Sequence, residues 1–185
     1  MINHTHGDIF ATDCVALVNT VNCVGVMGAG IALGVKQRWP AIFSAYRLDC
    51  RAGIDCAGQP DPRIGPQRHQ RAPDCCRPGG SCAIHQVRPG HVIIRPTNQQ
   101  PVRFVFDFPT KRHWADKSEI EDIEAGLPAL ADAIRASFVP SIAIPPLGCG
   151  NGGLQWTAVR PLIEAALRSL ADIRIDLCGP ATPHS

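Results

Sequence analysis

The stretch VNTVNCVGVMGAGIA (residues 18–32) joins the end of an apolar segment to a run that holds three glycines, Gly25, Gly28 and Gly30. Glycine has no side chain to bury, so such a run contributes little to a core. It does allow backbone N–H groups to converge on a bound group at the start of a helix. The stretch therefore predicts a strand, a glycine-rich loop and a helix, with a ligand close to the loop backbone.

The composition around this stretch is typical of one globular domain over residues 1–185. Hydrophobic residues make up 45% of the chain and charged residues 18%, and the formal net charge is +2. That charge is too small to indicate a nucleic-acid binder by bulk electrostatics, so any contact with nucleic acid must be local. The N-terminal segment is not a signal peptide and no segment has the ~18 consecutive apolar residues of a membrane span, so we expect a cytoplasmic monomer without membrane contact.

Strand-like and helix-like segments alternate along the chain. Strands are predicted at residues 15–18, 91–94, 102–108, 141–144 and 174–177. Helices are predicted at 29–38, where Pro40 ends or interrupts the helix, and from apolar periodicity at 120–134 and 159–170. Ser118 and Glu121 suggest a capping box, and alternation in VRFVFDF places Val102, Phe104, Phe106 and Phe108 on one face. The pattern predicts an α/β fold, a three-layer α/β/α sandwich with a mixed central sheet.

Residues 51–85 break this pattern and are expected to form an irregular insert rich in Cys, Pro and Arg. Cys50, Cys56, Cys75, Cys76 and Cys82 raise the question of zinc, but no CxxC pair occurs, so the spacing does not favour a metal. The arginines of the insert could instead contact DNA phosphates, although a solvated, disordered segment is the default expectation. The odd count of nine cysteines does not favour a disulfide framework in a cytoplasmic chain.

A second glycine-rich loop follows the strand at 141–144, in IPPLGCGNGGLQW (residues 144–156). It too joins a strand to a helix, so both loops should lie at the carboxyl edge of the sheet. Neither loop matches the dinucleotide fingerprint GxGxxG or a Walker loop. Two such loops at one cleft suit a diphosphate better than a single phosphate.

Four segments together resemble one family: GDIF (7–10), VNTVNCVGVMGAGIA (18–32), FPTKRHW (108–114) and PPLGCGNGGLQW (145–156). In this order they resemble a macrodomain, specifically the DarG type, the antitoxins that remove the ADP-ribose which a DarT toxin places on DNA bases. The resemblance implies ADP-ribose as ligand, ADP-ribosylated DNA as substrate, a DarT-like toxin as partner and no required cofactor.

The resemblance also assigns roles to residues of this chain. It places Asp8 and Ile9 at the adenine, Asn22 at the distal ribose, and Lys111 at the reacting bond. The diphosphate loops it implies are Gly28, Ala29, Gly30 and Ile31 for the first, and Gly148, Cys149, Gly150, Asn151 and Gly152 for the second. From the residues alone, Asp8 could equally be a turn or cap residue, and Asn22 a strand-end residue that binds backbone groups.

Lys111 fits the chemistry of glycosidic C–N cleavage in two ways. As an ammonium it would protonate the departing base, and as a free amine with a lowered pKa it would attack the anomeric carbon. The sequence leaves both open and suggests Arg112 and His113 as neighbours that lower the pKa. His113 is a candidate helper or else a packed side chain beside Trp114, and Cys149 is expected to be a small loop residue and not a nucleophile.

Three functions remain in competition. Macrodomain hydrolases that act on proteins pair their lysine with an aspartate where this chain has Asn151, and Asn cannot act as a base near neutral pH. The sequence therefore favours a DNA ADP-ribosyl glycohydrolase with Lys111, Asn151 and His113 at the reacting bond. The alternatives are a non-catalytic ADP-ribose binding module and an ADP-ribosyl-protein hydrolase.

Overall fold

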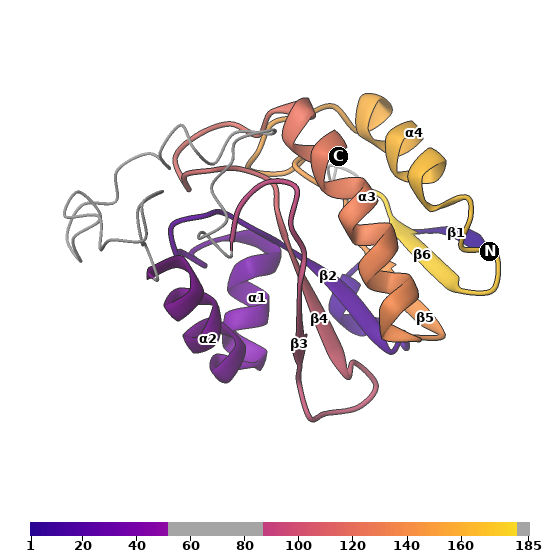
Figure 1. Cartoon of the computed structure of the whole chain (residues 1–185), viewed down its shortest axis with the longest axis horizontal. Coiled ribbons are helices and arrows are strands. Elements are labelled where there is room, and N and C mark those ends of the chain that lie inside the picture. Colours follow the sequence, from indigo (N-terminus) through magenta and orange to yellow (C-terminus); the bar gives the residue numbers. More distant parts are fainter. Residues whose placement is uncertain (52–86, 181–185) are drawn as a thin grey trace.

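The computed structural model describes residues 1–51 and 87–180, within which strands alternate with helices (Figure 1). The elements are β1 (Ile2–Thr5), the short 3-10 helix η1 (Ile9–Ala11), β2 (Ala16–Val21), α1 (Gly30–Arg38), α2 (Pro40–Arg51), β3 (Ile93–Pro96), β4 (Phe104–Pro109), α3 (Ile120–Ser137), β5 (Ser141–Ile144), α4 (Trp156–Leu167) and β6 (Arg174–Cys178). The predicted insert, with its zinc and DNA-contact hypotheses, lies outside the described residues except at its first position.

The strands form one mixed sheet in the order β1-β6-β5-β2-β4-β3. All neighbours run parallel except β3, which pairs antiparallel with β4 at the edge. β2 lies at the centre, with Ala16–Val21 in register with Phe104–Pro109 of β4. Because β2, β4 and β5 are parallel, their carboxyl ends meet at one edge of the sheet, where the predicted loops follow.

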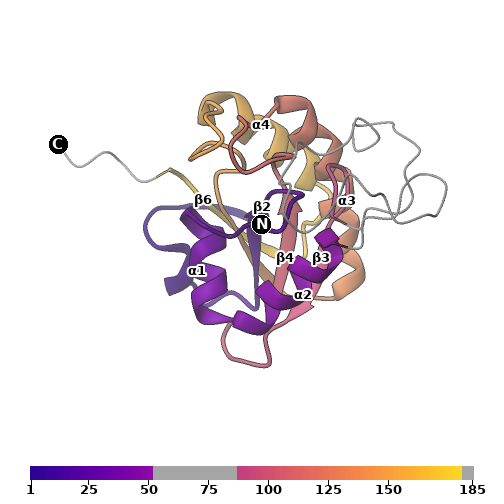
Figure 2. The ribbon, with the colours of Figure 1, turned by 90° about the vertical axis from the view of Figure 1, so that its left-hand side faces the viewer.

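Helices cover both faces of the sheet, as predicted. Figure 1 shows α1 and α2 on one face and α3 and α4 on the other, and Figure 2 shows the same layers from the side. On the α3 and α4 face, Val18 and Phe106 are fully buried; on the α1 and α2 face, Leu17 and Val105 are fully buried. Burial on both faces explains why these strands are apolar at most positions, with Asn19 and Asp107 as buried polar exceptions. Within the described ranges, no helix is both long and apolar enough to span a membrane.

Several elements differ from the prediction. β1 and α2 were not expected: β1 is short and half polar, and Pro40 begins a second helix, a position where proline's missing N–H costs nothing. Strand β3 begins at Ile93, two residues later than predicted. Val102 precedes β4 and packs in the cluster on the opposite face from Phe104, Phe106 and Phe108.

The predicted capping box is wrong. The N-cap of α3 is Glu119, which makes no side-chain cap, and the Ser118 hydroxyl has no hydrogen-bond partner among the described residues. Ser118 instead lies under the second glycine-rich loop, where its backbone N–H donates to the Gly152 carbonyl at 3.0 Å. Ser118 thus contacts the second loop, which is distant in the sequence, and does not cap α3.

Candidate functional site

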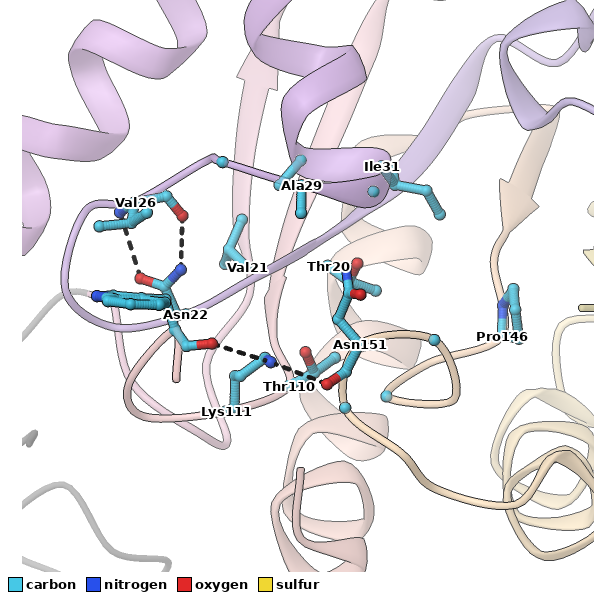
Figure 3. A pocket seen from close by; sticks show the side chains of 17 residues that line it. Thr20, Val21, Asn22, Val26, Ala29, Ile31, Thr110, Lys111, Pro146 and Asn151 are labelled. Atoms are coloured by element: carbon cyan, nitrogen blue, oxygen red, sulfur yellow. Dashed lines mark hydrogen bonds between the residues drawn. The ribbon is translucent and has the colours of Figure 1, made fainter. Parts of the chain in front are cut away.

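A cleft of about 670 Å³ lies at the carboxyl edge of the sheet, the position where open α/β sheets bind ligands. Its walls come from the three loops that follow β2, β4 and β5. The volume lies within the range of small-molecule sites, ~300 to 1,000 Å³. Figure 3 shows the side chains of the three loops meeting around this cleft.

Most of the predicted site residues line this one cleft. The lining includes Asn22, Gly28, Ala29, Gly30, Ile31, Lys111, Gly148, Gly150, Asn151 and Gly152. Four predicted residues do not line it: Asp8, Ile9, His113 and Cys149. Residues more than 100 positions apart in the sequence are thus brought together by the parallel strand order.

Asn22 shapes the first loop through its side chain. Its Nδ2 donates to the Val26 carbonyl at 2.5 Å, and its Oδ1 accepts from the N–H groups of Val24 (3.0 Å) and Val26 (3.3 Å) (Figure 3). The hydroxyl of Tyr46 on α2 donates to the Asn22 carbonyl at 2.7 Å. The same hydroxyl lies 3.0 Å from Asn22 Oδ1, and the other partners of the side chain are backbone groups. This matches the alternative of a strand-end residue that binds backbone groups, and the ribose role of Asn22 stays a prediction.

The first loop ends at the N-terminus of α1. Ala29, the N-cap, has an extended backbone and makes no side-chain cap. The first-turn N–H groups of a helix have no carbonyl partner within the helix, and they carry the positive end of its dipole. Gly30 begins the helix with a positive φ of 56°, a conformation that favours glycine. This end of α1 can accept an anion such as a phosphate.

The second loop is held rigidly over Ser118. Its backbone closes on itself, with Leu154 N–H donating to the Gly148 carbonyl at 3.1 Å and Gly153 N–H donating to the Gly150 carbonyl at 3.0 Å. A Cβ atom at Gly152 would clash with the Ser118 hydroxyl and the Gly148 carbonyl oxygen. Only glycine fits at position 152 without displacing the loop.

Lys111 bridges two of the three loops. Its Nζ donates to the backbone carbonyls of Trp114 (3.3 Å), Asp116 (3.1 Å) and Asn151 (3.4 Å), which we call the carbonyl cage. Figure 3 shows Lys111 and Asn151 side by side below Thr20. Burial, followed by the charge of Lys117, lowers the pKa of Lys111 below its ordinary value of 10.5. The ammonium is thus held at a fixed point of the cleft wall.

Of the two neighbours of Lys111, Arg112 differs from the prediction and His113 matches one of its two expected roles. The Arg112 guanidinium pairs with Glu119 (2.8 Å) and Asp122 (2.6 Å) and does not contribute to the lowered pKa of Lys111. His113 is 8% exposed and its Nδ1 accepts the Ala115 N–H at 3.3 Å. Its ring lies 5.3 Å from the Trp114 ring, centroid to centroid. His113 is therefore placed as a packed side chain beside Trp114.

Asp8 and Ile9 lie outside the cleft lining. The Asp8 carboxylate caps η1 by accepting the Phe10 N–H at 3.0 Å and lies 3.9 Å from the Arg38 guanidinium. Ile9 is buried in the core on the α1 side. Asp8 thus fulfils its alternative as a cap residue, and the adenine role of both residues stays a prediction.

Cys149 is not built as a nucleophile. Burial raises the pKa of its thiol to about 11, and its Sγ lies 3.4 Å from the Leu147 carbonyl. A thiol with a raised pKa is protonated at neutral pH. The expectation of a small loop residue is consistent with this environment.

The sequence analysis missed several residues that line the cleft, among them Thr20, Val26, Thr110, Pro146 and Trp114. Most of them contribute backbone or small side chains, which leave no sequence signal. Trp114 is different, because it ends the FPTKRHW motif three residues after Lys111, and that position in the motif was the available sequence signal. In the structure its side chain is 52% exposed.

One acidic group at the opposite edge of the sheet resembles a metal site. Asp13, Cys14 and Asp176 place ligand atoms within 4.8 Å of one another. The Arg174 guanidinium pairs with the Asp13 carboxylate and donates to Cys14 Sγ at 3.3 Å. The positive charge of Arg174 therefore already balances the negative charge of this group, as a bound metal ion would.

Comparisons with known proteins agree with this geometry. The family model described as "Macro domain" matches residues 52–163. The "DNA ADP-ribosyl glycohydrolase" of Mycobacterium tuberculosis is 37% identical over 98% of this chain, which spans 43% of that protein's length.

Solved structures extend the match to the fold. The "Macrodomain of Mycobacterium tuberculosis DarG" superposes with a TM-score of 0.79 and 36% identity, over 98% of this chain and 99% of that one. "Thermosipho africanus DarTG in complex with ADP-ribose" superposes with a TM-score of 0.73 and 25% identity, over 99% of this chain and 43% of that one. The layered fold, the paired glycine-rich loops and these matches together place the chain in the macrodomain family, where it is similar to DarG macrodomains.

Proposed function

We propose that this chain removes ADP-ribose from modified nucleobases of single-stranded DNA by cleaving the N-glycosidic bond. The observation that carries the proposal is Lys111, an ammonium fixed in the cleft wall between the two glycine-rich loops. The 37% identity to a protein named DNA ADP-ribosyl glycohydrolase supports the same activity. A base that is already unpaired reaches such a cleft without the cost of opening a duplex.

The cleft accommodates ADP-ribose in one direction. The diphosphate lies between the first turn of α1, whose N–H groups have no carbonyl partner within the helix, and the second loop, which also lines the cleft. The distal ribose then lies between Asn22 and Lys111, and the adenine points toward the η1 side of the molecule, near Asp8 and Ile9. Asn151, whose amide nitrogen lies close to Gly30, closes the cleft over the diphosphate.

The carbonyl cage favours Lys111 as a general acid. An ammonium has three N–H donors, and three carbonyl oxygens surround Nζ at 3.1–3.4 Å. A neutral amine has only two N–H donors and would direct its lone pair at the third oxygen, which is repulsive, so the cage favours the protonated form. To protonate the base, the ammonium turns one N–H from a carbonyl of the cage to the base nitrogen. Lys111 acts in our proposal by giving its proton to the base nitrogen as the C–N bond breaks and the bonding electrons move to the base. Water then adds to the oxocarbenium carbon and gives a proton to the neutral Lys111 amine, which yields free ADP-ribose and restores the ammonium.

The two rival functions use the same cleft. An ADP-ribose binding module would share the loops and would not need the lysine. A protein-directed hydrolase would need a carboxylate at position 151, where this chain has an amide that cannot serve as a base. The caged Lys111 and the amide of Asn151 favour the DNA-directed reaction over both.

We also propose a DarT-like toxin as the enzyme whose product this chain removes. A relative from Thermosipho africanus, 32% identical over 89% of this chain, is named a "DNA ADP-ribosyl transferase-DNA ADP-ribosyl glycohydrolase fusion protein". The curated relatives are more than twice as long as the stretch that they share with this chain, so direct contact with a toxin is a separate question. In this proposal the chain works in the cytoplasm.

The proposal is tested by offering three molecules to the protein: an ADP-ribosylated single-stranded oligonucleotide, a protein ADP-ribosylated on carboxylate side chains, and free ADP-ribose. We expect release of ADP-ribose from the oligonucleotide with a rate that exceeds release from the protein by about two orders of magnitude. Release from the protein alone would favour the protein-directed hydrolase. Tight binding of ADP-ribose by calorimetry without release from either substrate would favour the binding module.

A further inference from the structure

The exposed indole of Trp114 stands at the mouth of the cleft without an assigned role. Trp114 is 52% exposed and lines the same cleft as Lys111. Among the described residues of the lining, it is the aromatic one. An indole costs free energy when it stands in water, because its apolar area remains hydrated. Its retention at the edge of a ligand cleft therefore points to a planar, apolar group that covers it.

The backbone of Trp114 is tied to the reacting point. The Lys111 Nζ donates to the Trp114 carbonyl at 3.3 Å, and the same nitrogen donates to the Asn151 carbonyl at 3.4 Å on the second loop. Lys111 therefore lies between the diphosphate side of the cleft and the backbone that carries the indole. In the proposed binding direction the diphosphate lies on the Asn151 side of Lys111, so a base bonded to the anomeric carbon next to Lys111 would extend toward the Trp114 side.

His113 supports the indole from the core side. The two rings lie 5.3 Å apart with an interplanar angle of 37°, and His113 is 8% exposed. The His113 ring is itself oriented by the Ala115 N–H, which donates to Nδ1 at 3.3 Å. A buried ring beside an exposed one limits the rotamers of the exposed indole, and this preorganisation lowers the entropy cost of stacking.

We propose that Trp114 is the stacking platform for the nucleobase that carries ADP-ribose, with His113 as its positioning residue. The inference rests on the proposed function, since it assigns the leaving group a place in the same cleft. Stacking on an aromatic side chain is the usual way in which proteins hold unpaired bases, and it tolerates any base because every base has a π-face. The platform makes the cleft selective for an aromatic leaving group over an aliphatic protein side chain.

The test measures binding in a Lys111→Ala background, so that the substrate persists. The ligands are an ADP-ribosylated single-stranded oligonucleotide and free ADP-ribose, and the added variants are Trp114→Ala, Trp114→Phe and Phe138→Ala. Phe138 is the matched control, an aromatic residue that is 91% exposed at the end of α3, outside the cleft lining. We expect Trp114→Ala to weaken oligonucleotide binding about tenfold or more, with a far smaller change for ADP-ribose. Trp114→Phe should keep most of the affinity, and Phe138→Ala should change neither ligand.

Equal losses for both ligands, or no loss for the oligonucleotide, would overturn the platform. A second readout comes from Trp114→Ala in the protein with Lys111 intact: a lost platform raises KM for the oligonucleotide more than it lowers kcat, whereas a displaced Lys111 lowers kcat. Failure of the proposed function can be told apart from failure of the stacking platform. It would appear as no release by the unaltered protein, while the binding comparison still decides whether Trp114 holds the base.

Discussion

At the scale of single residues, Lys111 carries the proposed chemistry, and the backbone carbonyls around it hold its ammonium group in the cleft. The motif FPTKRHW predicted the lysine, and the structure places it in the cleft with its ammonium in the carbonyl cage. The cage itself was not predictable, because its oxygens belong to the backbone of residues 114, 116 and 151, and any sequence supplies such oxygens. The ion pairs of Arg112 with Glu119 and Asp122 were unpredictable for the same reason, because they are set by how the loop folds. His113 lies as the packed side chain that was one of its two expected roles, and its role as a helper stays a prediction.

The pH dependence of the reaction separates the two possible roles of Lys111. A general acid works in its protonated form, so the single-turnover rate should be level at low pH and should fall as the pH rises through the lowered pKa of Lys111, below 10.5. An amine nucleophile would give the opposite slope, with a rate that increases up to that pKa. The measurement is release of ADP-ribose from the oligonucleotide between about pH 6 and pH 10.

Lys111→Arg provides the control for charge alone. Arginine keeps the positive charge but does not lose its proton in proteins. We expect this variant to bind ADP-ribose and to release almost none from the oligonucleotide. A variant that turned over at a comparable rate would show that charge, and not proton donation, is what position 111 supplies.

At the scale of elements, the site depends on three loops that follow three parallel strands. The sequence predicted β5 at its observed bounds and β2 and β4 with ends displaced by one to three residues, because these strands are mostly apolar and buried. It also predicted both glycine-rich loops. It did not predict α2, whose Tyr46 hydroxyl holds the backbone of Asn22 at 2.7 Å. It also placed a capping box at Ser118, whose real partner is the second loop. Both errors concern contacts between segments distant in the chain, which local patterns do not report.

The second loop gives a direct test of this packing. Gly152→Ala inserts a Cβ against the Ser118 hydroxyl and the Gly148 carbonyl, so we expect a loss of about 1–3 kcal/mol in the free energy of unfolding and a large loss of ADP-ribose affinity. The control for stability is Gly150→Ala in the same loop, where an added Cβ meets nothing within 4 Å. Urea unfolding and calorimetry measure the two effects. Equal stability of both variants would mean that the loop relaxes around the added methyl group.

At the scale of the whole molecule, a buried ionic network joins a helix layer to the sheet. Arg95 on β3 pairs with Asp107 on β4 and with Asp49 on α2 at 2.6 Å, and Asn19 on β2 donates to Asp107 at 2.7 Å. The alternation of strands and helices predicted the three layers. It could not predict this network, because charged residues in a sequence usually lie on the surface. Burial raises the pKa of Asp107, an effect that Arg95 partly offsets.

Removing Arg95 tests the importance of this network. Arg95→Met leaves the Asp107 carboxylate buried without its cation, and we expect a loss of about 3–5 kcal/mol in the free energy of unfolding at neutral pH. Because the folded-state pKa of Asp107 then lies still further above its unfolded value, stability should recover as the pH falls and the carboxyl is protonated. Arg103→Met, at an exposed arginine one residue before β4, is the control and should stay within about 0.5 kcal/mol of the unaltered protein. Urea unfolding at two pH values measures the free energy of unfolding of both variants. If Arg95→Met lost the same free energy at both pH values, the loss would come from packing and not from the unpaired carboxylate of Asp107.

The central claim is that the lysine in the cleft makes this macrodomain an enzyme that acts on modified DNA. The most direct measurement compares release of ADP-ribose from an ADP-ribosylated single-stranded oligonucleotide by the unaltered protein, by Lys111→Ala and by Lys36→Ala. Lys36 is the matched control, a lysine on α1 outside the cleft lining. We predict that the unaltered protein and Lys36→Ala release ADP-ribose at similar rates, and that Lys111→Ala loses at least about two orders of magnitude in rate while it still binds ADP-ribose. Release by Lys111→Ala at the rate of the unaltered protein would contradict the account.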